Sequence, residues 1–248
     1  MACKVLRPEY CIDFSSLEAV LQEGEMLCRL RHPNVVEGYS VELEDHPRIS
    51  MEYLPGLTVR DTFFQDNYDA FDLSDAVAVV AQLADALSYV HREGYLHLDV
   101  KPSNVMYFDG EATLFDFSVA EPFSPDKPLK DNAGTTEYMA PEQTYRNEVG
   151  YATDVFGLGV VFYRLLTGGE LPYRVVKRLL PGDDEDDEPT RQLDYEVRPR
   201  PPSELNPRVS PSLEAVVMKA VQPSMDDRFQ SPADFRAALA GTRASAVR

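Results

Sequence analysis

Two short polar segments constrain this chain more than any other part of its sequence. Residues 97–104 read His-Leu-Asp-Val-Lys-Pro-Ser-Asn, and Asp-Phe-Ser follows at 116–118, twelve residues after the asparagine. The segments place two carboxylates, a lysine and a carboxamide on neighbouring loops. Such a set can hold a divalent metal, a polyphosphate and an attacking hydroxyl in one place. We therefore expect a fold that brings both loops to one cleft.

Composition limits the partners of the chain. It has 248 residues, of which 44% are hydrophobic, enough for one large domain or two small lobes. The net charge is −18, so nucleic acid and anionic membranes are not expected as partners, because both would be repelled. The three cysteines form no CxxC pair and no signal peptide is visible, which predicts a cytoplasmic protein. The longest apolar stretch, 155–166, is too short and too mixed to cross a bilayer.

Hydrophobic periodicity predicts an α+β protein with a small β-rich part followed by a mostly helical part. We place the small part at 1–54, the helical part at 55–242 and a tail at 243–248. The elements predicted for the small part are a strand over 2–6, a helix capped by Ser15 or Ser16 that ends at 32–34, and strands over 35–43 and 48–53.

The second part has four predicted helices and one charged loop. Residues 181–189 read Pro-Gly-Asp-Asp-Glu-Asp-Asp-Glu-Pro and predict a solvated acidic loop, because like charges repel and nothing there can be buried. The predicted helices run from a cap at Ser74 or Asp75 to about 92, over 153–166, over about 211–221 and over about 232–240.

The two polar segments resemble the catalytic and metal-binding loops of eukaryotic-type (Hanks-type) bacterial Ser/Thr protein kinases. The resemblance covers nearly the whole chain and implies a bilobal kinase-like fold that uses ATP and Mg²⁺, with Mn²⁺ as a substitute. It implies that Asp99 orients the substrate hydroxyl and that Lys101 neutralises the transferred phosphate. Asn104 and Asp116 would hold the metal, and Thr135 would bridge Asp99 and Lys101.

The same resemblance assigns residues to the nucleotide. Lys4 matches the lysine that reaches the α- and β-phosphates, and Glu23 matches its glutamate partner on the following helix. Glu25 is the alternative partner, and helical geometry allows only one of the two to face Lys4. The adenine ring would lie at the linker between the lobes. Its expected contacts are Ala2, Met51, Glu52, Leu54 and Met106, although core packing is the more ordinary role for each of these apolar residues alone.

Other matches concern the substrate and the scaffold. Residues 134–142, Gly-Thr-Thr-Glu-Tyr-Met-Ala-Pro-Glu, resemble the end of the activation segment and favour a protein substrate over a small molecule. Asp154 matches a residue that supports the catalytic loop, and Arg228 matches the architectural partner of Glu142. His97 reads as a scaffold residue. The candidate autophosphorylation sites are Ser124, Thr135 and Thr136.

The chain also departs from the family pattern. Only three residues precede Lys4, so we expect no Gly-rich hairpin above the phosphates, weak ATP affinity and low turnover, and we leave open a partner that completes the small lobe. Leu98 stands where the family has an arginine whose charge a phosphorylated activation loop neutralises, and Ser118 stands where the family has a glycine. Two functions stay open: a Ser/Thr protein kinase, or a catalytically impaired pseudokinase that acts as a regulatory binding module.

Overall fold

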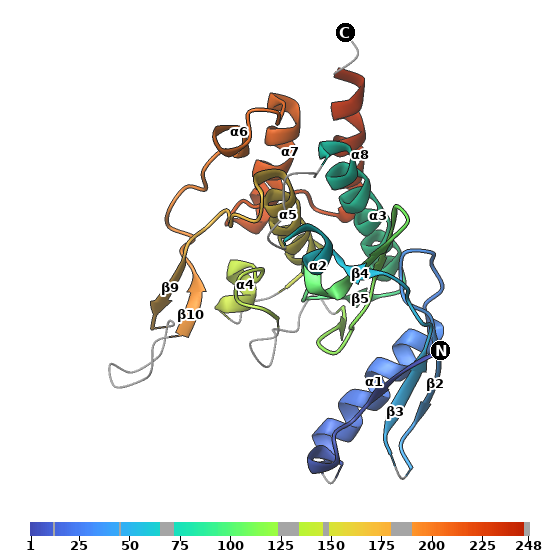
Figure 1. The fold of residues 1–248 in the computed structure, drawn as a ribbon. Helices are drawn as coiled ribbons and strands as arrows, with labels where there is room; N and C mark the ends of the chain where they lie inside the picture. The colour runs from blue at the N-terminus through green and yellow to red at the C-terminus, as the bar shows by residue number, and fades with distance from the viewer. Residues whose placement is uncertain are drawn as a thin grey trace.

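The computed structural model folds into two lobes, a small one with a sheet and one long helix and a larger helical one (Figure 1). The acidic segment 181–189 and Ser124 lie outside the part of the chain that the structure describes. The described residues are 1–11, 13–44, 46–64, 72–123, 134–145, 149–179 and 190–245.

The small lobe is a three-stranded antiparallel sheet with α1 (Phe14–Arg29) packed beside it (Figure 1). Helix and sheet approach closely at Gly24 and Gly38. A Cβ on Gly24 would lie 2.5 Å from the Val41 Cβ, so only glycine allows this distance. The sheet has the order β1-β3-β2, with β1 at Ala2–Val5, β2 at Gly38–Glu42 and β3 at Arg48–Met51.

The two long helices of the N-terminal half are capped by Asp13 and Asp72, and not by the residues predicted from the sequence. The Asp13 carboxylate accepts the backbone N–H of Ser16 at 3.1 Å and begins α1. The Asp72 carboxylate accepts the N–H of Ser74 at 3.1 Å and begins α3 (Leu73–Arg92). The predictions of Ser15 or Ser16 and of Ser74 or Asp75 are wrong by two or three residues, because an earlier carboxylate accepts the free N–H groups.

The large lobe is built around α3 and α5 (Tyr151–Thr167), which pack against each other in its core. Among the described helices α3 alone is long and apolar enough to cross a bilayer by length and composition, but 56% of its apolar window is buried, which fits a core helix. The remaining helices are α2 (Val59–Phe63), α4 (Pro141–Thr144), α6 (Pro202–Leu205), α7 (Pro211–Ala220) and α8 (Pro232–Ser245).

Short strands in the large lobe carry the polar loops. Strands β4 (Leu57–Thr58), β6 (Val105–Phe108) and β7 (Glu111–Leu114) form one sheet in the order β4-β6-β7. The two-stranded pairs are β5 (Tyr95–Leu96) with β8 (Glu121–Pro122), and β9 (Val175–Arg178) with β10 (Thr190–Leu193). The sequence does not predict the β9–β10 pair, which Figure 1 draws on the α4 side of the large lobe.

The lobes are joined by backbone hydrogen bonds as well as by the covalent linker after Met51. Val36 N–H donates to the Leu114 carbonyl at 2.9 Å, and Leu114 N–H donates to the Asn34 carbonyl at 2.8 Å. The Asn34 side chain adds a bond to the Ala112 carbonyl at 2.9 Å. Strand β2 therefore begins at Gly38 and not at the predicted residue 35, because the preceding residues bond to β7 across the lobes.

Candidate active site

A buried carboxylate fixes the backbone of segment 97–104. Asp154, at the start of α5, accepts the N–H of His97 at 2.9 Å and the N–H of Leu98 at 2.7 Å. Burial by itself would raise the pKa of Asp154, but hydrogen bonds from His91 and this backbone lower the pKa below its ordinary value. Leu98 has φ = 63°, a conformation that costs free energy in a leucine. The ionised Asp154 stabilises this strained turn.

Asp99, Lys101, Asn104 and Thr135 meet at the end of this turn. Lys101 Nζ donates to Asp99 Oδ2 at 2.5 Å and to Thr135 Oγ1 at 2.7 Å. Asn104 Nδ2 donates to the same Asp99 Oδ2 at 3.0 Å. Asp99 Oδ1 is buried and has no hydrogen-bond partner among the described residues. One oxygen of Asp99 is thus held by two donors, while the other is buried and unpaired among the described residues.

The β6–β7 hairpin brings the two predicted metal ligands to one end of a sheet. Its register pairs Val105 with Leu114, and Phe115 N–H donates to the Asn104 carbonyl at 2.9 Å. Asn104 and Asp116 therefore lie on adjacent loops. Among the described residues no three His, Cys, Asp or Glu side chains form a metal cluster. A carboxylate and a carboxamide still fit Mg²⁺, which commonly takes one or two protein oxygens together with substrate phosphates and water.

Lys4 links both lobes through two carboxylates. Its Nζ contacts Glu23 Oε1 at 2.8 Å and Oε2 at 2.9 Å, and it contacts Asp116 Oδ1 at 2.7 Å. Glu25 is exposed and faces Arg29 instead, so Glu23 is the carboxylate that lies against Lys4. Partial burial would lower the pKa of Lys4, but the charge of Glu23 and the Asp116 hydrogen bond raise it overall.

The backbone at Asp116 turns this carboxylate toward Lys4 and the following ring toward the core. Asp116 has φ = 63°, and Phe117 is 1% exposed. The Phe117 ring packs edge-on against His97, with ring centroids 4.7 Å apart. Burial would raise the pKa of Asp116, but the Lys4 hydrogen bond and charge lower it below its ordinary value. Asp116 is therefore ionised at neutral pH, as a metal ligand must be.

The structure places the predicted adenine contacts on both sides of the linker. Ala2 and Met51 are cross-strand partners in the β1–β3 ladder. Met106 lies on β6 of the other lobe, paired with Thr58 of β4. Each of the five residues predicted to contact adenine keeps some exposed surface, as cleft residues do, and their role in binding adenine stays a prediction. They are Ala2, Met51, Glu52, Leu54 and Met106.

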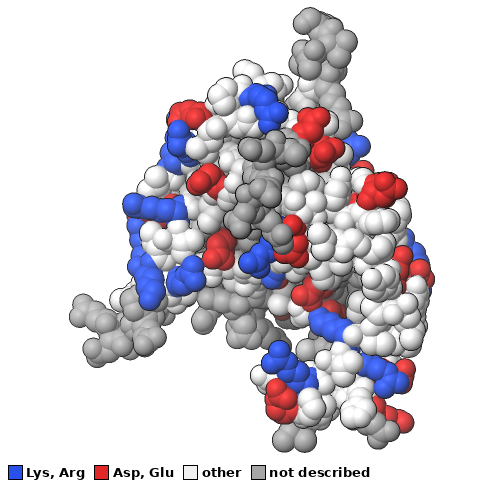
Figure 2. Space-filling model, viewed as in Figure 1, with Lys and Arg blue, Asp and Glu red and all other residues white. Residues whose placement is uncertain are grey.

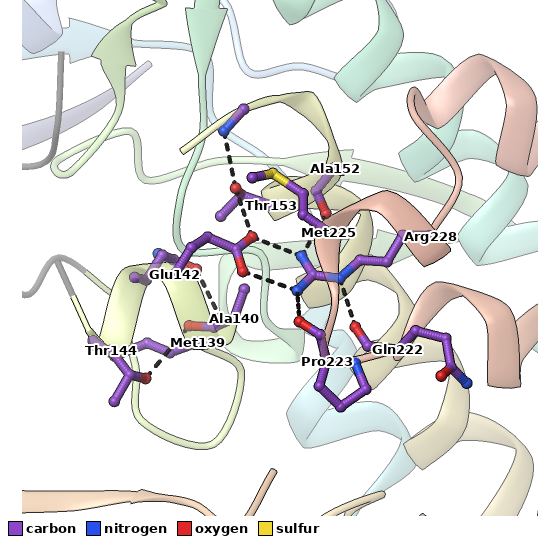
Figure 3. A network of polar contacts seen from close by, with 12 residues as sticks. Met139, Ala140, Glu142, Thr144, Ala152, Thr153, Gln222, Pro223, Met225 and Arg228 are labelled. Carbon is purple, nitrogen blue, oxygen red and sulfur yellow. Dashed lines mark hydrogen bonds and ion pairs between the residues drawn. The ribbon is translucent and has the colours of Figure 1, made fainter. Parts of the chain in front are cut away.

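Glu142 and Arg228 form a buried ion pair away from the cleft (Figure 3). Arg228 Nη1 and Nη2 contact the two Glu142 oxygens at 2.6 and 2.8 Å. The guanidinium also donates to three backbone carbonyls, so each of its five N–H groups has an acceptor. The pair anchors α4, at the end of segment 134–142, and has no exposed face for chemistry. The three carbonyls belong to Ala152, Gln222 and Pro223.

Two arginines near the site could not be identified from the sequence pattern. Arg60 on α2 and Arg164 on α5 line a cavity of about 600 Å³ together with Lys101 and Thr135. They are separated by the whole of α3 and both polar loops, so only the tertiary fold brings them together. No sequence motif marks either residue.

Comparisons with known proteins agree with this geometry. The family model described as the protein kinase domain matches residues 1–236. The serine/threonine-protein kinase PknB of Mycobacterium leprae is 33% identical over 250 residues, covering 96% of this chain and 38% of the relative. Myosin light chain kinase 2 of Rattus norvegicus is 31% identical over 172 residues, covering 68% of this chain and 28% of the relative.

Solved structures give the same fold. The crystal structure of the Mycobacterium tuberculosis PknI kinase domain matches with a TM-score of 0.68 at 26% identity, covering 96% of this chain and 84% of that one. A point mutant of the same PknI domain matches with a TM-score of 0.68 at 25% identity, covering 97% of this chain and 84% of the mutant. The chain spans 38% of the length of the PknB relatives that it matches.

Proposed function

The chain belongs to the protein kinase family, and we propose that it transfers the γ-phosphate of ATP to serine or threonine hydroxyls of a protein substrate. The observation that carries this proposal is the pair of contact sets on the two adjacent polar loops. Lys4 contacts Glu23 and Asp116 from the nucleotide side, while Lys101 joins Asp99 to Thr135 on the substrate side.

The substrate hydroxyl would bind at Asp99. Asp99 Oδ1 has no partner among the described residues, whereas Oδ2 accepts from Lys101 and Asn104. The unpaired Oδ1 would orient the hydroxyl and accept its proton as the new O–P bond forms and the bond from the γ-phosphorus to ADP breaks, with ADP as the leaving group. Lys101 Nζ, held between Asp99 and Thr135, would neutralise charge on the phosphoryl group in transit.

Lys4 would hold the α- and β-phosphates, with Glu23 fixing its position. The Asn104 carboxamide and the Asp116 carboxylate would hold Mg²⁺, with Mn²⁺ as a substitute, and the metal would neutralise charge on the phosphate oxygens. Because Lys4 now contacts Asp116, we expect the ammonium group to divide its hydrogen bonds between Glu23 and the phosphates once the nucleotide is bound.

A catalytically impaired pseudokinase is the alternative from the sequence. A pure binding module needs none of these contacts, and their presence together at one cleft supports the enzyme. The weak ATP affinity, a partner that completes the small lobe, the cytoplasmic location and the lack of nucleic-acid and membrane partners stay predictions from the sequence.

Transfer of labelled phosphate from ATP to the chain itself and to a generic protein acceptor tests the proposal. We expect Mg²⁺-dependent transfer in the unaltered protein and a loss of at least about 100-fold in Asp99→Asn, because the proton acceptor is removed. Asp109→Asn is the matched control, since Asp109 is an exposed residue of the β6–β7 turn. Equal label in the unaltered protein and Asp99→Asn would exclude the enzyme.

A further inference from the structure

The cavity beside Lys101 and Thr135 has an unusual balance of charge for so acidic a chain. Its charged lining is Arg60, Lys101, Glu137 and Arg164. Lys101 pairs with Asp99 at 2.5 Å, and Glu137 pairs with Arg191 at 3.3 Å. Arg60 and Arg164 have no carboxylate within ion-pair distance in the described part of the chain. The cavity therefore carries two uncompensated positive charges.

The Arg164 guanidinium is held in a fixed orientation. Its Nε donates to the Gly169 carbonyl at 2.9 Å, and Nη1 donates to the Tyr138 hydroxyl. Its central carbon lies 4.7 Å from the centroid of the Phe64 ring and 5.6 Å from that of Tyr138. Two of its five N–H groups are engaged by described residues, which leaves donors for a bidentate contact with an anion. An arginine held in this way loses little side-chain entropy on binding.

We propose that this cavity is a subsite for an anionic side chain of the protein substrate, a carboxylate or a phosphate, read by Arg164 and Arg60. The inference rests on the proposed function, because Lys101 and Thr135 place the cavity beside the acceptor hydroxyl. A cavity of about 600 Å³ is ~10 Å across, which an extended chain covers in about three residues. The acidic residue would therefore lie within about three positions of the acceptor.

The rest of the surface makes this local charge selective. With a net charge of −18, the protein repels acidic chains in general, so an acidic peptide gains affinity only where arginines lie exposed. Figure 2 shows acidic and basic side chains interspersed over most of the face viewed, with lysines and arginines more frequent toward the edge where β9 and β10 lie in Figure 1. Arg191 of β10, which neutralises Glu137, belongs to that edge.

A peptide set tests the subsite. Each peptide carries one threonine, with the three positions on each side occupied by glutamate, glutamine, lysine or phosphoserine. We expect kcat/KM for the glutamate peptide to exceed that for the lysine peptide at least about tenfold, with glutamine between them. Arg164→Glu should reverse the order, and Arg60→Glu should weaken it. A higher rate for phosphoserine than for glutamate would identify phosphate as the better ligand.

Arg236→Glu is the control, because Arg236 lies on α8 and faces Asp85, away from the cavity. It should leave the order of the peptides unchanged. Arg60 is exposed on α2, so its variant keeps the test informative should Arg164→Glu fail to fold. Equal kcat/KM for glutamate and lysine peptides, or an order unchanged in both variants, would overturn the subsite.

A binding measurement separates this proposal from the proposed function. Fluorescence anisotropy of the same labelled peptides, without ATP, reports the subsite whether or not phosphate is transferred. Tighter binding of the glutamate peptide, weakened by Arg60→Glu, would support the subsite even in a protein that transfers no phosphate. Transfer without any preference in either assay would leave the kinase and remove the subsite.

Discussion

Two ion-pair networks hold remote parts of this chain together, and they differ in burial. Lys4 meets Asp116 across 112 residues, and Glu142 meets Arg228 across 86 residues. The Arg228 side chain is 0% exposed and that of Glu142 is 7% exposed. The Lys4 and Asp116 side chains are 42% and 34% exposed. Similar charges therefore meet in two environments, one closed to water and one open to it.

Burial decides what each network can do. All five N–H groups of Arg228 have acceptors in the protein, so any rearrangement would leave a buried charge unpaired. Lys4 has water on one side and can exchange a carboxylate for a phosphate at small cost. The buried pair maintains the fold, whereas the open one is available for ligands.

Arg228→Met should give the largest loss of stability. It leaves Glu142 buried without its partner, so we expect the free energy of unfolding to fall by about 3–5 kcal/mol, measured by chemical denaturation. Arg236→Met removes an exposed partner of Asp85 and should cost less than about 1 kcal/mol. Adding Glu142→Met to Arg228→Met should recover part of the loss. A cost below about 1 kcal/mol for Arg228→Met would show that the pair is not structural.

Lys4→Met should show the opposite pattern. We expect phosphate transfer to fall about 100-fold, because a charge aimed at the phosphates is removed. The free energy of unfolding should fall by less than in Arg228→Met, because Asp116 is open to water and the pKa of the buried Glu23 is already raised by burial. The measurements are labelled-ATP transfer and denaturation of the same preparation. Arg29→Met alters an exposed pair on α1 and should affect neither quantity. Full transfer activity in Lys4→Met would contradict a role in phosphate binding.

Glu23→Gln should have a smaller effect on transfer. The glutamine keeps a hydrogen-bond acceptor for Lys4 and loses only the charge, so we expect a loss of about tenfold. Glu25→Gln, two residues along the same helix and exposed, is the matched control and should leave transfer unchanged. A larger loss in Glu25→Gln than in Glu23→Gln would mean that α1 is rotated relative to the arrangement described above.

Acid should weaken the open network first. Burial would raise the pKa of Asp116, but the Lys4 hydrogen bond and charge, with smaller contributions from Ser118 and His97, together hold the pKa below its ordinary value of 3.8. The contribution of Asp116 to stability is therefore complete above about pH 4 and is lost as the pH falls through the lowered value. We expect the difference in unfolding free energy between the unaltered protein and Asp116→Asn to close on acidification. In a Lys4→Met background this difference should change less with pH, because the Lys4–Asp116 pair is already absent.

Several features of the site could be predicted from the sequence because the family pattern specifies them residue by residue. The polar loops, the Lys4–Glu23 contact and the Arg228–Glu142 pair all lie at positions that the family pattern specifies. The family motif assigns each of these positions separately, so they can be predicted without knowing how the chain packs. It leaves the roles of the predicted adenine contacts to be measured.

Other features could not be predicted from the sequence pattern. The caps at Asp13 and Asp72 are misplaced in the prediction because serines and aspartates stand close together, and geometry decides which oxygen reaches the free N–H groups. The β9–β10 pair forms between segments on both sides of the acidic stretch, which local pattern cannot pair. Arg60 and Arg164 line one cavity although more than 100 residues separate them in the sequence, so only the tertiary fold brings them to it.

The hydrogen bonds between residues 34–36 and β7 have a mechanical consequence. They join the small lobe to the large one at a second place, besides the covalent linker after Met51. A body attached at two places can rotate only about the line through them. We therefore expect the small lobe to rock about a single axis without twisting, so that Lys4 returns to the same position relative to Asp116 after each such movement.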